Sequence, residues 1–321
     1  SSYDIETTNN AVFGNIKVNI GNSDLITFSS NVYIKRLWYQ FGRLYARTHN
    51  LKVDQIDYSL GTGADRARFD WDQDGTIQND EKGVLGPNDM FIFDGNQSDG
   101  GLSILITGNG NYTFPIGIGT DGSEMSHNNS KYTPAEVTIT NFSDTGYVTI
   151  TPVDAELQTT DLSGGDIVSY YWNVDYSDFT TNPTVEYEFY YYESDLDGSS
   201  NEATFVPGKV LDFNPYTRSY ENDNTQVSNV ADTDGIWNRI VFNDHDNGGG
   251  GFTLENANYT AGEAARFVGI PDVFNSNSSY VSWNTPSAWL ENQVPTAGSI
   301  VYIHNGDRMS GPTTDVGYEA P

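Results

Sequence analysis

In the stretch VEYEF, apolar and acidic side chains alternate, and this alternation restricts what the chain can fold into. Val185, Tyr187 and Phe189 would share one face of an extended strand, whereas Glu186 and Glu188 would share the other. Strict alternation fits a strand that buries one face and exposes the other, and it does not fit a helix. The sequence therefore predicts a half-buried strand of a β-sandwich at this position.

Short apolar segments occur along the whole chain, and glycine, asparagine and aspartate separate them. The best candidate for a helix, residues 33–47, is interrupted by Gly42, and its aromatic residues fit strands equally well, so we predict strand–turn–strand there. Aromatic residues make up 13% of the chain, which argues against a disordered acidic polymer. The sequence therefore predicts an all-β fold.

The spacing of these segments predicts three regions. Residues 1–130 contain short, evenly spaced strands, which favour a β-solenoid-like stack or a sandwich. Residues 131–268 contain longer strands with prolines at their ends, and an immunoglobulin-like β-sandwich is the expected fold. Residues 269–321 are too few to bury a core alone, so we expect an appendage of the sandwich or the start of a further β domain.

Acidic residues outnumber basic residues by 44 to 15, which gives a formal net charge of −29. Such a field repels the phosphates of nucleic acids and anionic membranes, so neither is expected as a partner, and it attracts divalent cations. No cysteine is present, so bound metal is the expected cross-link instead of disulfides. The longest apolar run, Leu102–Ile106, has the length of one strand, so membrane insertion is not expected.

Residues 70–81, DWDQDGTIQNDE, have the ligand spacing of an EF-hand-like calcium loop. Gly75 stands where the loop turns sharply and needs a residue that tolerates positive φ, and Ile77 can anchor the loop. Glycines close to both ends do not suit flanking helices, so we predict an isolated loop with a structural role rather than a sensor. The alternative is an acidic, solvated turn. The predicted calcium ligands are Asp70, Asp72, Asp74, Thr76 through its carbonyl, Gln78 and Glu81.

Other acidic segments and the histidines give weaker signals. Asp195–Gly198 and Asp232–Gly235 resemble the start of a calcium loop without its final glutamate, and Asn243–Asn247 fits a solvated hairpin tip better than a metal site. The four histidines are scattered, and no nucleophile or phosphate-binding motif is present. Carboxylate pairs arise by chance in so acidic a chain, so we do not expect an enzyme.

Clustered aromatic residues leave two interpretations open beside the core. Alternating core positions explain most of them, and the surplus rings fit a subunit interface better than a platform for stacking carbohydrate. Self-association is therefore the first expected interaction, and binding of cell-surface glycans is the second. The residues concerned are Trp38, Tyr39, Tyr170, Tyr171, Trp172 and the run 190–192.

Three stretches share motifs with one known family. The first joins Phe114–Gly117 (FPIG) to Lys131–Pro134 (KYTP), the second is Gly164–Trp172 (GGDIVSYYW), and the third joins Ser282–Trp289 (SWNTPSAW) to Gly298–Gly306 (GSIVYIHNG). Together they resemble the transition, sandwich-strand and solenoid motifs of large repetitive cell-surface proteins of Bacteroidota. In that family a solenoid is followed by a sandwich and then by a new solenoid.

The resemblance implies a structural role and says little about a ligand. Such proteins are adhesins or parts of cell-surface filaments and are typically exported by the type IX secretion system. For this chain it implies an extracellular, surface-located structural or adhesive segment, which calcium would stabilise and which would assemble with itself or with other surface proteins. The alternative is a carbohydrate-binding module of a secreted protein.

Overall fold

The computed structural model describes residues 2–5, 11–19, 25–58, 90–119, 130–157, 167–192, 195, 205–210, 220–221, 237–242, 251–263, 273–275, 281–282, 300–302 and 309–310. None of these residues lies in an α-helix, and most of them form strands. The predicted all-β class is therefore confirmed. Within the same described ranges, no helix is long and apolar enough to span a bilayer.

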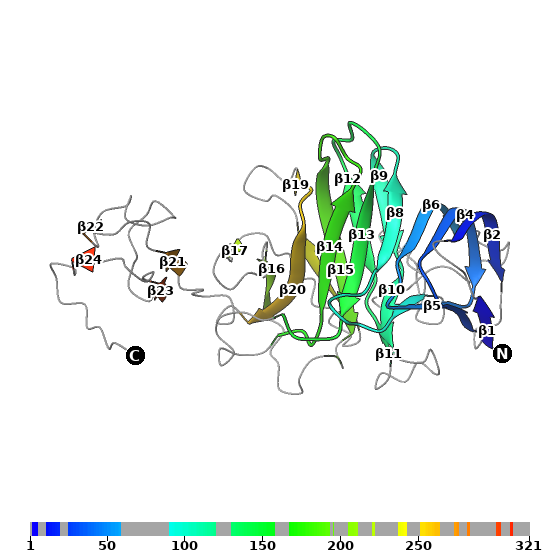
Figure 1. The fold of residues 1–321 in the computed structure, drawn as a ribbon, viewed down its shortest axis with the longest axis horizontal. Helices are drawn as coiled ribbons and strands as arrows, with labels where there is room; N and C mark the ends of the chain where they lie inside the picture. The colour runs from blue at the N-terminus through cyan, green and yellow to red at the C-terminus, as the bar shows by residue number, and fades with distance from the viewer. Residues whose placement is uncertain are drawn as a thin grey trace.

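The N-terminal strands form a stack of coils, because successive strands alternate between two parallel arrays (Figure 1). The first array belongs to a six-stranded sheet and contains β1 (Ser2–Ile5), β3 (Leu25–Phe28), β5 (Arg43–Arg47), β7 (Phe91–Phe93) and β10 (Ile116–Gly119). The second belongs to a nine-stranded sheet and contains β2 (Ala11–Asn19), β4 (Val32–Phe41), β6 (Leu51–Tyr58) and β8 (Leu102–Ile106). This arrangement is solenoid-like, which is one of the two arrangements predicted for residues 1–130.

The coils stack side chains of the same kind above one another. Ile34 on β4 lies beside Val53 on β6, 19 positions later, and both are fully buried. The next partner in the same row, Ile104 on β8, follows Val53 only after 51 positions. Most of the additional chain is the segment 59–89 between β6 and β7, which lies outside the described residues. The predicted calcium ligands Asp70 to Glu81 fall in that segment, so the structure does not test them.

Beyond β8 the nine-stranded sheet continues with antiparallel strands, and a second sheet packs on this part to form a sandwich (Figure 1). The nine-stranded sheet continues through β13 (Gly146–Val153), β14 (Tyr171–Ser177), β20 (Ala257–Glu263), β16 (Phe205–Val210) and β17 (Tyr220–Glu221). A five-stranded sheet faces it and contains β9 (Gly110–Phe114), β12 (Ala135–Ile139), β15 (Thr184–Tyr192), β18 (Trp237–Phe242) and β19 (Phe252–Thr253). Trp172 and Phe189 stack between the two sheets with ring centroids 4.7 Å apart.

A bent hairpin links the two halves of the molecule. Its first arm passes from β9 to β10 at Pro115, and its second arm passes from β11 (Ser130–Tyr132) to β12 at Pro134. The two arms keep one antiparallel register across the bend, so the outer half of the hairpin completes the six-stranded sheet and the inner half belongs to the sandwich. Proline suits the bend because it fixes φ and requires no hydrogen-bond partner for its nitrogen.

One hydrophobic core runs through the coils and the sandwich, from Val18 on β2 to Ala261 on β20. The predicted boundary after residue 130 falls inside β11, and the nine-stranded sheet contains strands from both sides of it. The coils and the sandwich are therefore joined by a shared sheet and a shared core. The division into three domains and the immunoglobulin-like connectivity stay predictions.

The last four strands again pair in parallel across alternate positions. β21 (Val273–Asn275) pairs with β23 (Ile300–Tyr302), and β22 (Val281–Ser282) pairs with β24 (Met309–Ser310). Figure 1 places these strands at one end of the long axis and β1 and β2 at the other. This is the alternation of the N-terminal coils, and it agrees with the expected start of a further β region.

Candidate functional site

A polar network lies where the coils meet the sandwich, on the outer face of the nine-stranded sheet. The Asp54 carboxylate of β6 accepts a hydrogen bond at each oxygen, from the Tyr33 hydroxyl at 2.6 Å and from the Tyr147 hydroxyl at 2.5 Å. Tyr33 belongs to β4, and Tyr147 to β13, the first antiparallel partner of β8. One carboxylate therefore ties two coils to the sandwich.

Both phenols stay protonated donors at neutral pH. The hydrogen bond to Asp54, together with burial, raises the pKa of Tyr33. Burial is the main cause that raises the pKa of Tyr147, followed by its hydrogen bond to Asp54. The carboxylate in turn gains two donors that share its charge, so the three side chains hold each other in fixed positions.

Lys52 lies over this network. Its ammonium nitrogen is 3.5 Å from the centroid of the Tyr147 ring, 6.0 Å from that of Tyr33 and 3.6 Å from Asp178 Oδ2. Asp178 lies in the turn after β14 with φ of 69°, a left-handed conformation that aspartate tolerates better than most residues. Lys52 thus joins the coil side of the junction to a turn of the sandwich.

A groove of about 420 Å³ opens at this network. Its walls combine aromatic rings, carboxamides and one ion pair, so it presents both an apolar surface and hydrogen-bonding groups to solvent. It is lined by Asn31, Val32, Tyr33, Asn50, Lys52, Tyr147 and Asp178.

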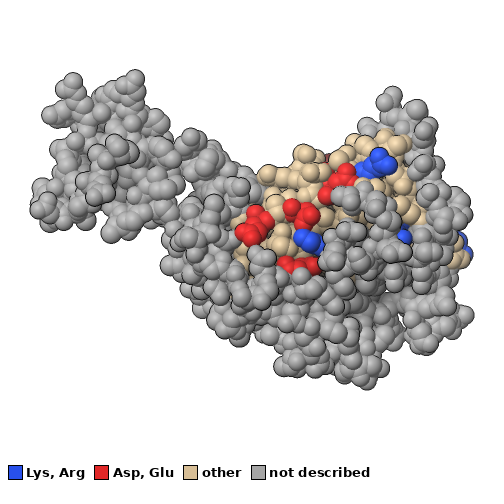
Figure 2. Space-filling model, turned by 90° about the horizontal axis from the view of Figure 1, so that it is seen from below, with Lys and Arg blue, Asp and Glu red and all other residues tan. Residues whose placement is uncertain are grey.

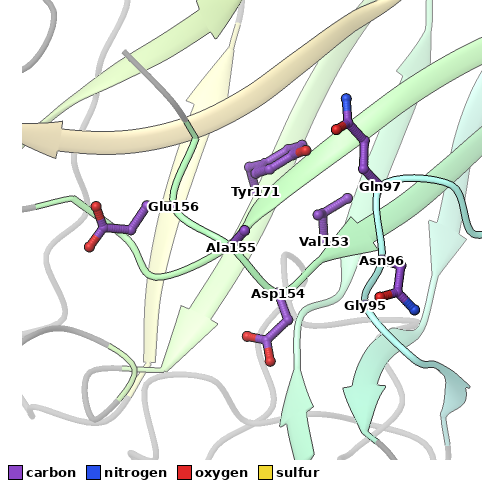
Figure 3. Close-up of a pocket in the computed structure, with 8 residues that line it drawn as sticks. All are labelled: Gly95, Asn96, Gln97, Val153, Asp154, Ala155, Glu156 and Tyr171. Atoms are coloured by element: carbon purple, nitrogen blue, oxygen red, sulfur yellow. The ribbon is translucent and has the colours of Figure 1, made fainter. Parts of the chain in front are cut away.

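A second cavity, of about 340 Å³, lies between the loop after β7 and the end of β13 (Figure 3). Asp154 at its edge is paired with Lys131 at 2.5 Å, and Figure 3 shows Asp154 and Glu156 pointing in different directions. Burial raises the pKa of Tyr171, at the back of the cavity, to about 12. Because the two carboxylates do not converge on a common point, this cavity does not hold an acid–base pair.

On the outer face of the five-stranded sheet, a buried glutamate lies beside a half-buried one. Glu136 on β12 lies directly opposite Glu188 on β15, and only 8% of Glu136 is exposed. Glu188 accepts hydrogen bonds from Tyr190 at 2.8 Å and from Arg239 at 3.2 Å. Burial, and then the neighbouring Glu188 charge, raise the pKa of Glu136 to about 7. The pair therefore makes stability depend on pH near neutrality.

Some charges elsewhere on the described surface are paired with opposite charges. On the face shown in Figure 2, the acidic side chains form several groups with basic side chains beside them. Arg36, for example, pairs with Asp57 at 2.6 Å and lies over the Trp38 ring. Among the described residues, no group of three or more histidine, aspartate and glutamate side chains could hold a metal ion.

Most of the clustered aromatic residues are core residues, as their alternation predicted, whereas the predicted outer-face surface is wrong for Tyr190 and Tyr191, which are both buried. Five rings that were candidates for an interface or a glycan platform are buried, with 0 or 1% exposed, and Tyr171 is 4% exposed. Among the members whose burial the structure describes, Trp38 alone is partly exposed. Four of the buried rings belong to the hydrophobic core, namely Tyr39, Tyr170, Trp172 and Tyr191, and Tyr190 donates a hydrogen bond to Glu188.

The weaker acidic segments receive little or no structural test. Asp195 is 7% exposed and accepts a hydrogen bond from Tyr170 at 3.2 Å, so it supports the core. The rest of that segment lies outside the described residues, and so do Asp232–Gly235 and Asn243–Asn247.

The sequence interpretation missed the junction network. A signal for it exists, because aligning AVFGNIKVN, VYIKRLWYQ and LKVDQIDYS places Tyr33 beside Lys52, as the register of β4 and β6 does. Tyr147 lies 93 positions from Asp54, and no local pattern joins the two. Comparisons with protein-family models, curated proteins and solved structures find no match for this chain. The family resemblance therefore stays a prediction.

Proposed function

We propose that the chain is a structural or adhesive segment of a secreted bacterial surface protein or appendage. The observation that carries the proposal is the nine-stranded sheet, which continues from the parallel coils into the antiparallel sandwich without a break. Such a sheet transmits force through hydrogen bonds of one ladder rather than through a linker. A chain built in this way suits a rigid shaft better than a pair of independently moving domains.

The ends of the molecule support this role. The parallel pairs β21–β23 and β22–β24 repeat the alternation of the coils at the opposite end from β1 and β2 (Figure 1). Solenoids grow by adding coils along one axis, so this order of elements suits a protein of extended shape. We propose that it assembles with itself or with other surface proteins.

Calcium has a structural part in the proposal. The predicted ligands lie between β6 and β7, where the chain leaves the regular spacing of the coils. An ion bound there would cross-link the long segment between β6 and β7. The chain has no cysteine, so a disulfide cannot do this. The proposal assigns no catalytic step to the chain, and places it at the cell surface or outside the cell.

Immunogold electron microscopy of the source cells tests this proposal. Antibodies raised against residues 1–321 should label the outside of intact cells or extracellular fibres, without permeabilisation. An antibody to a cytoplasmic protein, used on the same cells, controls for leakage. Label that appears only after permeabilisation would contradict the surface role.

A further inference from the structure

We propose that the groove at the junction of the coils and the sandwich binds a neutral saccharide unit. This goes beyond the proposed function, because a structural segment needs no ligand. The groove volume of about 420 Å³ lies within the range of small-ligand sites, which is roughly 300–1,000 Å³. It has room for a monosaccharide or disaccharide.

Two carboxamides supply hydrogen-bond donors to the groove. Asn31 Oδ1 accepts a bond from the Asn50 backbone N–H at 2.9 Å, and Asn50 Oδ1 accepts one from the Ser103 hydroxyl at 3.0 Å. These bonds orient both side chains, and in the described part of the chain neither side-chain NH₂ group donates to a protein acceptor. Each NH₂ group is available to a hydroxyl group of a ligand.

Asp178 supplies the matching acceptor. Its side chain is 63% exposed at the rim of the groove, and the left-handed turn holds it 3.6 Å from Lys52. Planar carboxylate and carboxamide groups can each bind adjacent hydroxyl groups, the arrangement that a pyranose ring presents.

The apolar part of the groove is formed by the tyrosine rings, because Val32 is 2% exposed and packs in the core. Tyr33 is partly exposed, and its hydroxyl is fixed by Asp54, so the ring is held in place before a ligand arrives. One face of many pyranoses carries C–H groups, which pack against an aromatic ring. Preorganised rings lower the entropy cost of binding.

Charge and topology disfavour other ligands. Lys52 is the single cation among the residues that line the groove, and it pairs with Asp178, so phosphates gain no net attraction. A peptide cannot add a strand here, because β4 and β6 already pair on both sides. The polar rim does not suit a lipid chain. A neutral polyhydroxyl ligand fits these conditions.

Saturation-transfer difference NMR with the full chain tests the proposal. The probes are glucose, galactose, mannose and N-acetylglucosamine, each added alone at millimolar concentration. At least one of them should receive saturation from the protein. Failure of all four with folded protein would overturn the proposal, and it would leave the immunogold test of the structural role unaffected.

Variants locate the site. Asp178→Asn keeps a residue that tolerates the left-handed turn, and it should weaken binding at least about tenfold by removing the charged acceptor. Tyr33→Leu should weaken it similarly by removing the ring. Asp175→Asn, the same chemical change on an exposed residue of β14 outside the groove, should bind like the parent. Unchanged binding in Asp178→Asn would overturn the assignment, even if Tyr33→Leu fails to fold.

Discussion

Glu136→Gln is the substitution whose effect on stability the structure defines most closely. Glu136 is 8% exposed, and it lies opposite Glu188, which is already bonded to Arg239 and Tyr190. Burial and the Glu188 charge raise its pKa from 4.5 to about 7. Glutamine has nearly the same shape and cannot ionise, so the variant removes the titration and keeps the packing.

The sign and size of the effect follow from the pKa of Glu136. The folded chain keeps a proton that the unfolded chain releases, so this group stabilises the fold fully below pH 4.5, and the stabilisation is lost as pH rises through about 7. Each pKa unit corresponds to about 1.4 kcal/mol, so the loss between pH 4 and pH 8 is roughly 3 kcal/mol. Glu136→Gln should therefore be more stable than the parent at pH 8 by up to roughly that amount, and similar to it at pH 4.

Urea unfolding followed by tryptophan fluorescence at pH 4, 6 and 8, at constant calcium, measures this difference. Carboxylates away from this pair titrate equally in both proteins, so the difference between them reports Glu136 together with its coupling to Glu188. Glu156→Gln changes an exposed glutamate and should leave the pH dependence as it is in the parent. Equal pH dependence in Glu136→Gln and the parent would refute the reasoning, as would a loss of stability at pH 8.

Three further changes test the calcium loop and the junction. Calcium should raise the thermal unfolding midpoint of the parent more than that of Glu81→Gln, and a parent midpoint unaffected by EDTA would show that no structural calcium is bound. Leu102→Ala empties a fully buried position on β8, the strand shared by coils and sandwich, and should cost about 2–5 kcal/mol in urea unfolding; a cost below about 1 kcal/mol would contradict the shared core. Gly101→Ala should destabilise the fold, because φ is 72° and the added Cβ would lie 2.2 Å from Thr151 Oγ1. Gly108→Ala, which meets nothing within 4 Å, is its control, and equal midpoints for the two variants would contradict this.

Local patterns predicted the strands well. The alternation of VEYEF corresponds to β15, in which Tyr187 and Phe189 are fully buried. The strand–turn–strand interpretation of residues 33–47 is confirmed by β4 and β5, with Gly42 between them at φ of 107°. Both features depend on neighbours in sequence, because side-chain alternation and positive φ are set by the local backbone.

Features that depend on distant residues were not predicted. Alternation alone places Tyr190 on the outer face of β15 with Glu188, yet Tyr190 is 0% exposed. The Asp54–Tyr147 contact and the continuation of β6 through β8 into β13 join segments that share no motif. The periodicity of the coils was also hidden, because partner positions recur after 19 residues in one pair of strands and 51 in another.

The central claim is that the coils and the sandwich form one continuous body. Hydrogen exchange measured by mass spectrometry in increasing urea follows β4 in the coils and β15 in the sandwich separately within one sample. A shared sheet and core predict that both strands lose protection at the same urea concentration. Loss of protection in β4 at a clearly lower concentration, with β15 still fully protected, would contradict a single body.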